Sequence, residues 1–179
     1  GNALNAATPL TIPGLSVAFG FRAGLFNIGA QGQFFLGAFM AAIVGTRLVG
    51  VPFPIGMAIA VLAGALGGAF WGFIPGILKA WRGAHEVVVT IMLNSVAALF
   101  LNLLASGLFR DPGATFPRTP DVQPGALMPI LVEGTRLHGG IFLALIVAAA
   151  TWFLLFKTTL GFEIRTVGEH APVVESQYC

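Results

Sequence analysis

Long apolar runs separated by short polar links are the feature that most constrains the fold of this chain. Residues 53–77, 87–108 and 140–156 carry no charged side chain. A helix of about 20 apolar residues spans the hydrocarbon core of a bilayer. Charged residues make up only 9% of the 179, whereas soluble domains carry about 25%. The runs therefore predict an integral membrane protein built from helical spans.

Two weaker candidate spans precede these runs. Residues 8–21 are apolar but short and contain two prolines, and residues 23–46 are long enough to span but begin irregularly. We therefore expect an all-α, polytopic transmembrane helical bundle with four to five spans in a single domain, residues 1–179. Gly1 opens almost directly into apolar sequence, and residues 172–179 stop without a closing apolar element or a charged tail. We therefore also expect the chain to be incomplete at both ends.

The charges of the links predict the orientation of the spans. When the spans are counted, one face receives Arg22, Lys79, Arg82, Lys157 and Arg165. The positive-inside rule makes that face cytoplasmic. The loop at 110–138 falls on the other face and is long and proline-rich, with three arginines balanced by Asp111, Asp121 and Glu133. We therefore expect a multi-pass protein of the cytoplasmic (inner) membrane.

A glycine stripe marks the span at 53–77. Gly64, Gly68, Gly72 and Gly76 recur every four residues and share one helix face. In a bilayer such a stripe lets two helix backbones approach closely, so it predicts a tightly packed neighbouring helix. The alternative is that the stripe lines a solute path. Pro75 is expected to kink or end the helix.

The sequence offers little support for catalysis. It contains no Gly-x-Ser-x-Gly, His-Glu-x-x-His or Cys-x-x-Cys motif, and its three histidines fall in links. We therefore expect no catalytic residue, no metal site and no cofactor. A P-loop is also missing, so any ATP must be handled by another subunit. The basic residues are scattered singly, which does not suit nucleic acid.

Three side-chain amides, Asn27, Gln31 and Gln33, stand at the head of the second apolar run. On a helix Asn27 and Gln31 would share a face, while Gly29 and Gly32 weaken the helix between them. Irregular backbone at membrane depth is tolerated where it lines a cavity or is buried in protein. Two interpretations stay open: the amides line a solute path, or they join helices by hydrogen bonds.

A second polar face follows the link at 79–86. Glu86, Thr90, Asn94, Ala98 and Asn102 lie four residues apart along the span at 87–108. Thr90 and Asn94 are the candidate path residues because they lie farther from the interface than Glu86. The alternative is hydrogen bonding between helices without a ligand.

The last link, residues 158–170, is amphipathic and cytoplasmic by the charge rule. It is either a docking surface or an ordinary solvated turn, and its spacing alone favours the turn.

Three ordered motifs give the chain a family resemblance. Residues 26–33 read Phe-Asn-Ile-Gly-Ala-Gln-Gly-Gln, residues 78–80 and 86–94 read Leu-Lys-Ala and Glu-Val-Val-Val-Thr-Ile-Met-Leu-Asn, and residues 159–169 read Thr-Leu-Gly-Phe-Glu-Ile-Arg-Thr-Val-Gly-Glu. With these motifs the chain resembles the permease subunit of ABC importers for nucleosides and simple sugars, a group related to the ribose and branched-chain amino acid permeases. Gln31 stands where that family commonly has Glu, and the sequence after Glu169 departs from its pattern.

The resemblance implies a membrane-spanning permease that translocates a nucleoside or simple sugar and has no ATPase activity of its own. It implies cytoplasmic ABC ATPase subunits, a second permease subunit and an extracytoplasmic solute-binding protein as partners, besides membrane lipid. It also identifies candidates for coupling to the ATPase: Gly161, Glu163, Arg165, Gly168 and Glu169. The alternative functions are a passive channel or facilitator for small polar solutes and a structural membrane scaffold.

Overall fold

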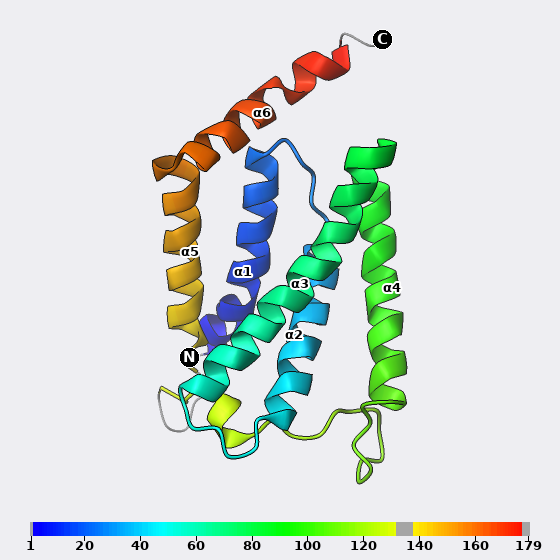
Figure 1. Cartoon of the computed structure of the whole chain (residues 1–179), viewed down its shortest axis with the longest axis vertical. Coiled ribbons are helices and arrows are strands. Elements are labelled where there is room, and N and C mark those ends of the chain that lie inside the picture. The colour runs from blue at the N-terminus through cyan, green and yellow to red at the C-terminus, as the bar shows by residue number, and fades with distance from the viewer. Residues whose placement is uncertain (1, 132–137, 177–179) are drawn as a thin grey trace. The chain divides into compact units, whose positions relative to one another are not determined.

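Helices make up most of the computed structural model, which describes residues 2–131 and 138–176 (Figure 1). These residues form α1 (Asn2–Arg22), α2 (Ala30–Arg47), α3 (Ile55–Arg82), α4 (Glu86–Ser106), the 3₁₀ helix η1 (Pro124–Ala126), α5 (Gly140–Lys157) and α6 (Thr159–Ser176). Within the described ranges no strand forms, and an isolated bridge pairs Ile130 with His138. The predicted all-α fold class is confirmed.

Three of the described helices, α3, α4 and α5, are long and apolar enough to cross a bilayer. The helices α1 and α2 correspond to the two weaker candidate spans and do not reach that hydropathy. The mean hydropathy of α2 is lowered by polar residues at its two ends, since its first turn contains Gln31 and Gln33 and its last residue is Arg47. We expected four to five spans, whereas three helices of the described residues qualify as candidate spans.

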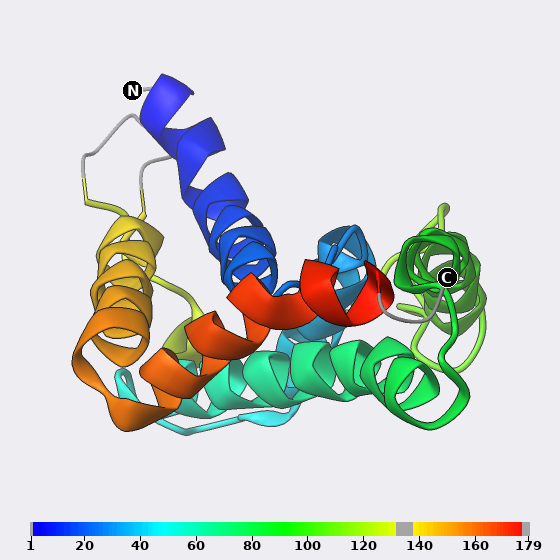
Figure 2. The same ribbon diagram turned by 90° about the horizontal axis from the view of Figure 1, so that it is seen from above.

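The chain divides into two compact units, each described here by itself. One contains Gly1–Ile28 and Pro129–Cys179, and the other contains Gly29–Met128. In the first, α1 packs against α5 and α6, and α6 turns away from the end of α5 to pass the end of α1 (Figure 2). In the second, α2 packs along α3, and α4 contacts both. The expectation of a single domain stays a prediction.

Close backbone contact joins α2 to α3. A Cβ atom added to Gly37 would lie 2.8 Å from the carbonyl oxygen of Gly64, and one added to Gly64 would lie 3.1 Å from that of Gly37. Gly68 and Gly72 also face the first turn of α2, whereas a Cβ on Gly76 would meet nothing within 4 Å. Three of the four glycines in the predicted stripe thus lie against α2.

The structure contradicts one half of the prediction that Pro75 kinks or ends its helix. Pro75 does not end α3, which continues to Arg82, and the kink stays a prediction. Proline inside a membrane helix is tolerated where neighbouring helices satisfy the freed backbone groups, and α3 packs against α2 and α4. The stop comes at Gly83, which adopts the left-handed conformation (φ +61°) and donates its N–H to the Lys79 carbonyl at 3.0 Å.

The part of the predicted exported loop that belongs to the same unit as α2, residues up to 128, contacts the end of that helix. The Gln123 N–H donates to the Gly45 carbonyl at the end of α2 at 3.1 Å. Within the loop Arg118 donates twice to one carboxylate oxygen of Asp111, at 2.6 and 3.0 Å. This hydrogen-bonded guanidinium lowers the pKa of the Asp111 carboxyl. Residues 132–137, which include Glu133 and Arg136, lie outside the described residues.

Gly37→Ala tests the close contact between α2 and α3. The added methyl group would press on a backbone carbonyl that cannot rotate away, and overpacking of this kind costs about 1–3 kcal/mol. We expect a lower melting temperature in detergent, followed by the helical circular dichroism signal. Gly76→Ala is the matched control, because its methyl group enters open space and alanine favours helix by about 1 kcal/mol. Equal melting temperatures for the two variants would contradict the contact.

Candidate functional site

The first turn of α2 needs hydrogen-bond acceptors that its own sequence does not supply. The residue before the helix, Gly29, has no side chain to bind the first backbone N–H groups. The Gly32 N–H donates instead to the Oδ1 atom of Asn94 on α4, at 2.9 Å. Asn94 therefore caps α2 from another helix, 62 residues along the chain.

The indole of Trp71 on α3 lies at the same point. A Cβ atom on Gly32 would lie 2.9 Å from Trp71 Nε1 and 2.9 Å from Asn94 Oδ1, so only glycine fits there. We call Gly32, Trp71 and Asn94 the polar junction. It joins the three helices of one unit.

Trp71 combines an apolar and a polar environment. The residue is 8% exposed and belongs to a core cluster with Leu36 and Ala97. Its Nε1 atom is buried, and the described residues offer it no hydrogen-bond partner. The indole N–H can only donate a hydrogen bond, and it has no acceptor within the described residues.

The two glutamines of α2 lie differently. The Gln33 side chain is half-buried and lies over Gly72, where a Cβ would be 3.0 Å from its Nε2 atom. Gln31 is exposed. Gln33 thus lies close to the residue next to Trp71, whereas Gln31 lies on the outside of its unit.

The polar face of α4 is largely used within the protein. Thr90 is 3% exposed, and its hydroxyl lies 2.8 Å from the Glu86 carbonyl oxygen, one turn back. The Glu86 carboxylate forms an ion pair with Lys79 across the turn between α3 and α4. Asn102 is exposed and accepts a hydrogen bond from Ser106 at 3.1 Å. The Thr90 hydroxyl thus bonds its own helix, and both roles considered for Thr90, solute contact and helix joining, stay predictions.

Asn27 does not share a helix face with Gln31, and that expectation is wrong. The helix α1 ends at Arg22, and Gly24 turns the chain with a positive φ of 70°. Because α2 begins only at Ala30, Asn27 lies in the irregular link. Its amide donates to the Ser16 hydroxyl on α1 at 3.3 Å. Asn27 thus belongs to one unit, and the four other path candidates belong to the other.

The link after α5 is a helix, and the solvated turn favoured by spacing alone is wrong. Thr158 explains the start of α6, because its Oγ1 atom accepts the Gly161 N–H at 3.1 Å, as an N-cap residue does. The same hydroxyl donates to the Leu154 carbonyl at 2.6 Å. One side chain therefore ends α5, starts α6 and fixes the elbow between them.

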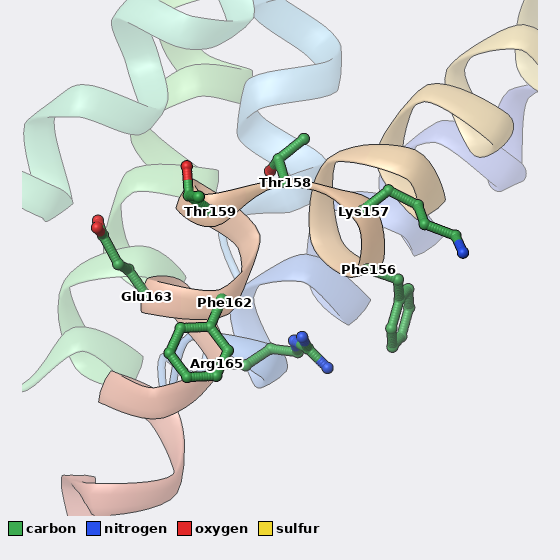
Figure 3. A pocket seen from close by; sticks show the side chains of 7 residues that line it. All are labelled: Phe156, Lys157, Thr158, Thr159, Phe162, Glu163 and Arg165. Carbon is green, nitrogen blue, oxygen red and sulfur yellow. The ribbon is translucent and has the colours of Figure 1, made fainter.

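A shallow groove of about 630 Å³ lies at this elbow and is lined by Phe156, Lys157, Thr158, Thr159, Phe162, Glu163 and Arg165 (Figure 3). Arg165 lies over the Phe156 ring, 5.1 Å from its centroid, and Arg22 lies 5.6 Å from the same centroid. Glu163 points away from Lys157 on the other side of the groove (Figure 3).

The five coupling candidates divide into packed and exposed residues. Gly161 is buried, Arg165 donates to its carbonyl at 3.3 Å, and a Cβ on Gly168 would lie 2.9 Å from the Gly24 nitrogen. Glu163 and Glu169 are exposed. The packed residues hold α6 on its own unit, and the two carboxylates are accessible.

Sequence reasoning missed Trp71. A signal was present, because this tryptophan falls among Gly67, Gly68 and Gly72 in the middle of a long apolar run. Tryptophans of membrane helices are enriched instead at the two interfaces. The partner of Gly32 had no comparable signal, because nothing in the spacing pairs it with Asn94.

Comparisons with known proteins give the chain relatives along its whole length. A family model described as branched-chain amino acid transport system / permease component matches residues 1–177. The guanosine ABC transporter permease protein NupP of Bacillus subtilis is 43% identical over 185 residues, which cover 99% of this chain and 51% of the relative. The nucleoside ABC transporter permease protein NupB of Lactococcus lactis is 34% identical over 176 residues, 94% of this chain and 48% of the relative.

The name of a third relative gives a different solute. The glucose ABC transporter permease protein TsgB13 of Haloferax volcanii is 33% identical over 174 residues, 92% of this chain and 46% of the relative. The chain thus spans about half the length of the curated relatives it matches, and no solved structure matches it significantly. Since the family model covers nearly every residue, this integral membrane protein belongs to the branched-chain amino acid transport system permease component family.

Proposed function

We propose that this chain is part of the permease subunit of an ABC importer that carries a nucleoside or simple sugar across the cytoplasmic membrane. The observation that carries the proposal is the 43% identity, over 99% of this chain, to a protein named as a guanosine permease. Relatives named for nucleosides and for glucose support the same solute class, because both solutes present a hydroxylated sugar ring.

The solute path is proposed to involve the side-chain amides. Asn27, Gln31, Gln33, Thr90 and Asn94 are its candidate residues. The contacts favour the glutamines, because Asn94 caps α2 and the Thr90 hydroxyl bonds its own helix. Asn94 would still act on transport by setting the position of the first turn of α2.

The proposed energy source lies in other subunits. The chain contributes no nucleotide-binding motif, so cytoplasmic ATPase subunits would bind and hydrolyse ATP, and this chain would be a transport subunit rather than an enzyme. A second permease subunit would complete the path, and an extracytoplasmic solute-binding protein would deliver the solute. ATP binding and release would then favour two permease conformations in turn.

The helix α6 is the proposed contact for the ATPase. The elbow at Thr158 and the packing of Gly168 connect α6 rigidly to α5 and to the end of α1. An ATPase subunit that contacts the exposed carboxylates of Glu163 and Glu169 and moves α6 would therefore also move α5 and the end of α1. Basic residues gather at the same helix ends, which supports a cytoplasmic position under the charge rule.

Uptake of labelled guanosine by cells that express the full-length permease with its ATPase, second permease and binding protein tests the proposed function. We expect uptake to be lost when the P-loop lysine of the ATPase is replaced, because inward transport against a gradient needs ATP hydrolysis. Uptake that persists with the inactive ATPase would identify a passive facilitator. Failure of both guanosine and glucose uptake would contradict the solute class.

Joint replacement of Glu163 and Glu169 by alanine tests the role of α6. We expect ATP-driven uptake to fall at least several-fold, while binding of guanosine to the detergent-purified complex stays unchanged. Asp121→Ala is the control, since it removes an exposed carboxylate from the loop. An unchanged uptake rate in the double variant would exclude these carboxylates from coupling.

A further inference from the structure

The buried indole N–H of Trp71 is the feature that the proposed function does not explain. A buried polar group without a partner costs about 1–3 kcal/mol, and most such groups in native proteins are satisfied. Phenylalanine would fill much of the same apolar volume beside Leu36 and Ala97 without this cost. A tryptophan here needs a reason that packing does not give.

The position of Trp71 along α3 excludes the usual reason for a membrane tryptophan. Trp81 and Trp152 are 78% and 55% exposed and lie near the ends of their helices, as interfacial tryptophans do. Trp71 is 8% exposed and lies about 16 Å along α3 from Arg82, at 1.5 Å rise per residue. Its N–H therefore cannot reach water at the membrane surface.

The surroundings of Nε1 point to an acceptor that enters from the first turn of α2. Gly32 lies against the indole N–H, because a Cβ atom added there would be 2.9 Å from Nε1. The Asn94 amide lies against Gly32, and the Gln33 amide lies over Gly72, the residue next to Trp71. The junction therefore gathers neutral hydrogen-bonding groups and no charged side chain, which suits a neutral, hydroxyl-rich ligand.

We infer that Trp71 is a solute-contacting residue, whose indole N–H donates to an oxygen or nitrogen acceptor of the transported nucleoside or sugar. The inference rests on the proposed function. In the described conformation Gly32 packs against the N–H, so the acceptor is reached when the first turn of α2 moves away from α3. A bound water is the other source of an acceptor, and it has the same hydrogen-bonding chemistry.

Trp71→Phe in the full-length permease, assembled with its partners, tests the inference through the KM and maximal rate of guanosine uptake. The variant keeps the aromatic ring and removes the donor. We expect KM to rise roughly 2- to 10-fold, because the variant loses one hydrogen bond to the solute. Trp81→Phe on the same helix is the matched control and should leave KM unchanged.

The outcomes separate the two proposals. If wild-type protein shows no ATP-driven uptake of guanosine or glucose, the proposed function fails and this inference fails with it. If wild-type protein transports guanosine and Trp71→Phe changes thermal stability but not KM, the N–H binds water only and the inference alone is overturned.

A second variant covers the case in which Trp71→Phe does not fold. Incorporation of 3-benzothienylalanine at position 71 replaces the indole N–H by sulfur and keeps the two-ring shape. The same rise in KM is expected, and an unchanged KM in this folded variant would overturn the inference.

Discussion

The hydrogen bond from the Gly32 N–H to Asn94 Oδ1 is the interaction on which the rest of the unit containing α2, α3 and α4 depends. A helix that starts inside a membrane protein must satisfy its first N–H groups without help from water. Gly29 offers no cap, and Asn94 supplies one from α4. This single bond fixes the start of α2 against α4 and places Gly32 over the edge of Trp71. Farther along the two helices, the contact between Gly37 and Gly64 allows α2 and α3 to approach each other closely.

A contact of this strength fits the proposed alternation between two permease conformations. Side-chain hydrogen bonds between membrane helices contribute about 0.6 kcal/mol on average, so one such bond orients a helix without locking it. Under the inference drawn above, movement of the first turn of α2 would break the bond to Asn94 and expose the Trp71 N–H. An incoming solute would then give this N–H the acceptor that the described residues do not offer. In the other unit, Thr158 fixes the elbow between α5 and α6, and Gly168 packs against the end of α1. Both contacts fit the proposed role of α6 in coupling.

Hydropathy predicted most of the fold, whereas the roles of the candidate site residues stay predictions. The uncharged runs located α3, α4 and α5, because span length and apolar composition are properties of a single segment. Composition does not reveal where α2 starts or that a helix follows Thr158. Both features depend on individual hydrogen bonds at the helix ends. The pairing of Gly32 with Asn94 depends on tertiary contact between segments 62 residues apart. Trp71 could have been noticed as an interior tryptophan, but its unmet hydrogen bond emerges only from packing.

Hydrogen–deuterium exchange at the Gly32 amide, measured at residue resolution in the full-length permease, tests most directly whether Asn94 caps α2. In the wild-type protein the account predicts a protected amide, because its acceptor is a half-buried side chain of a neighbouring helix. Asn94→Ala should speed exchange at Gly32 about tenfold or more, while Asn102→Ala, which removes an exposed amide from the same helix, should not. Equal exchange at Gly32 in all three proteins would contradict the account.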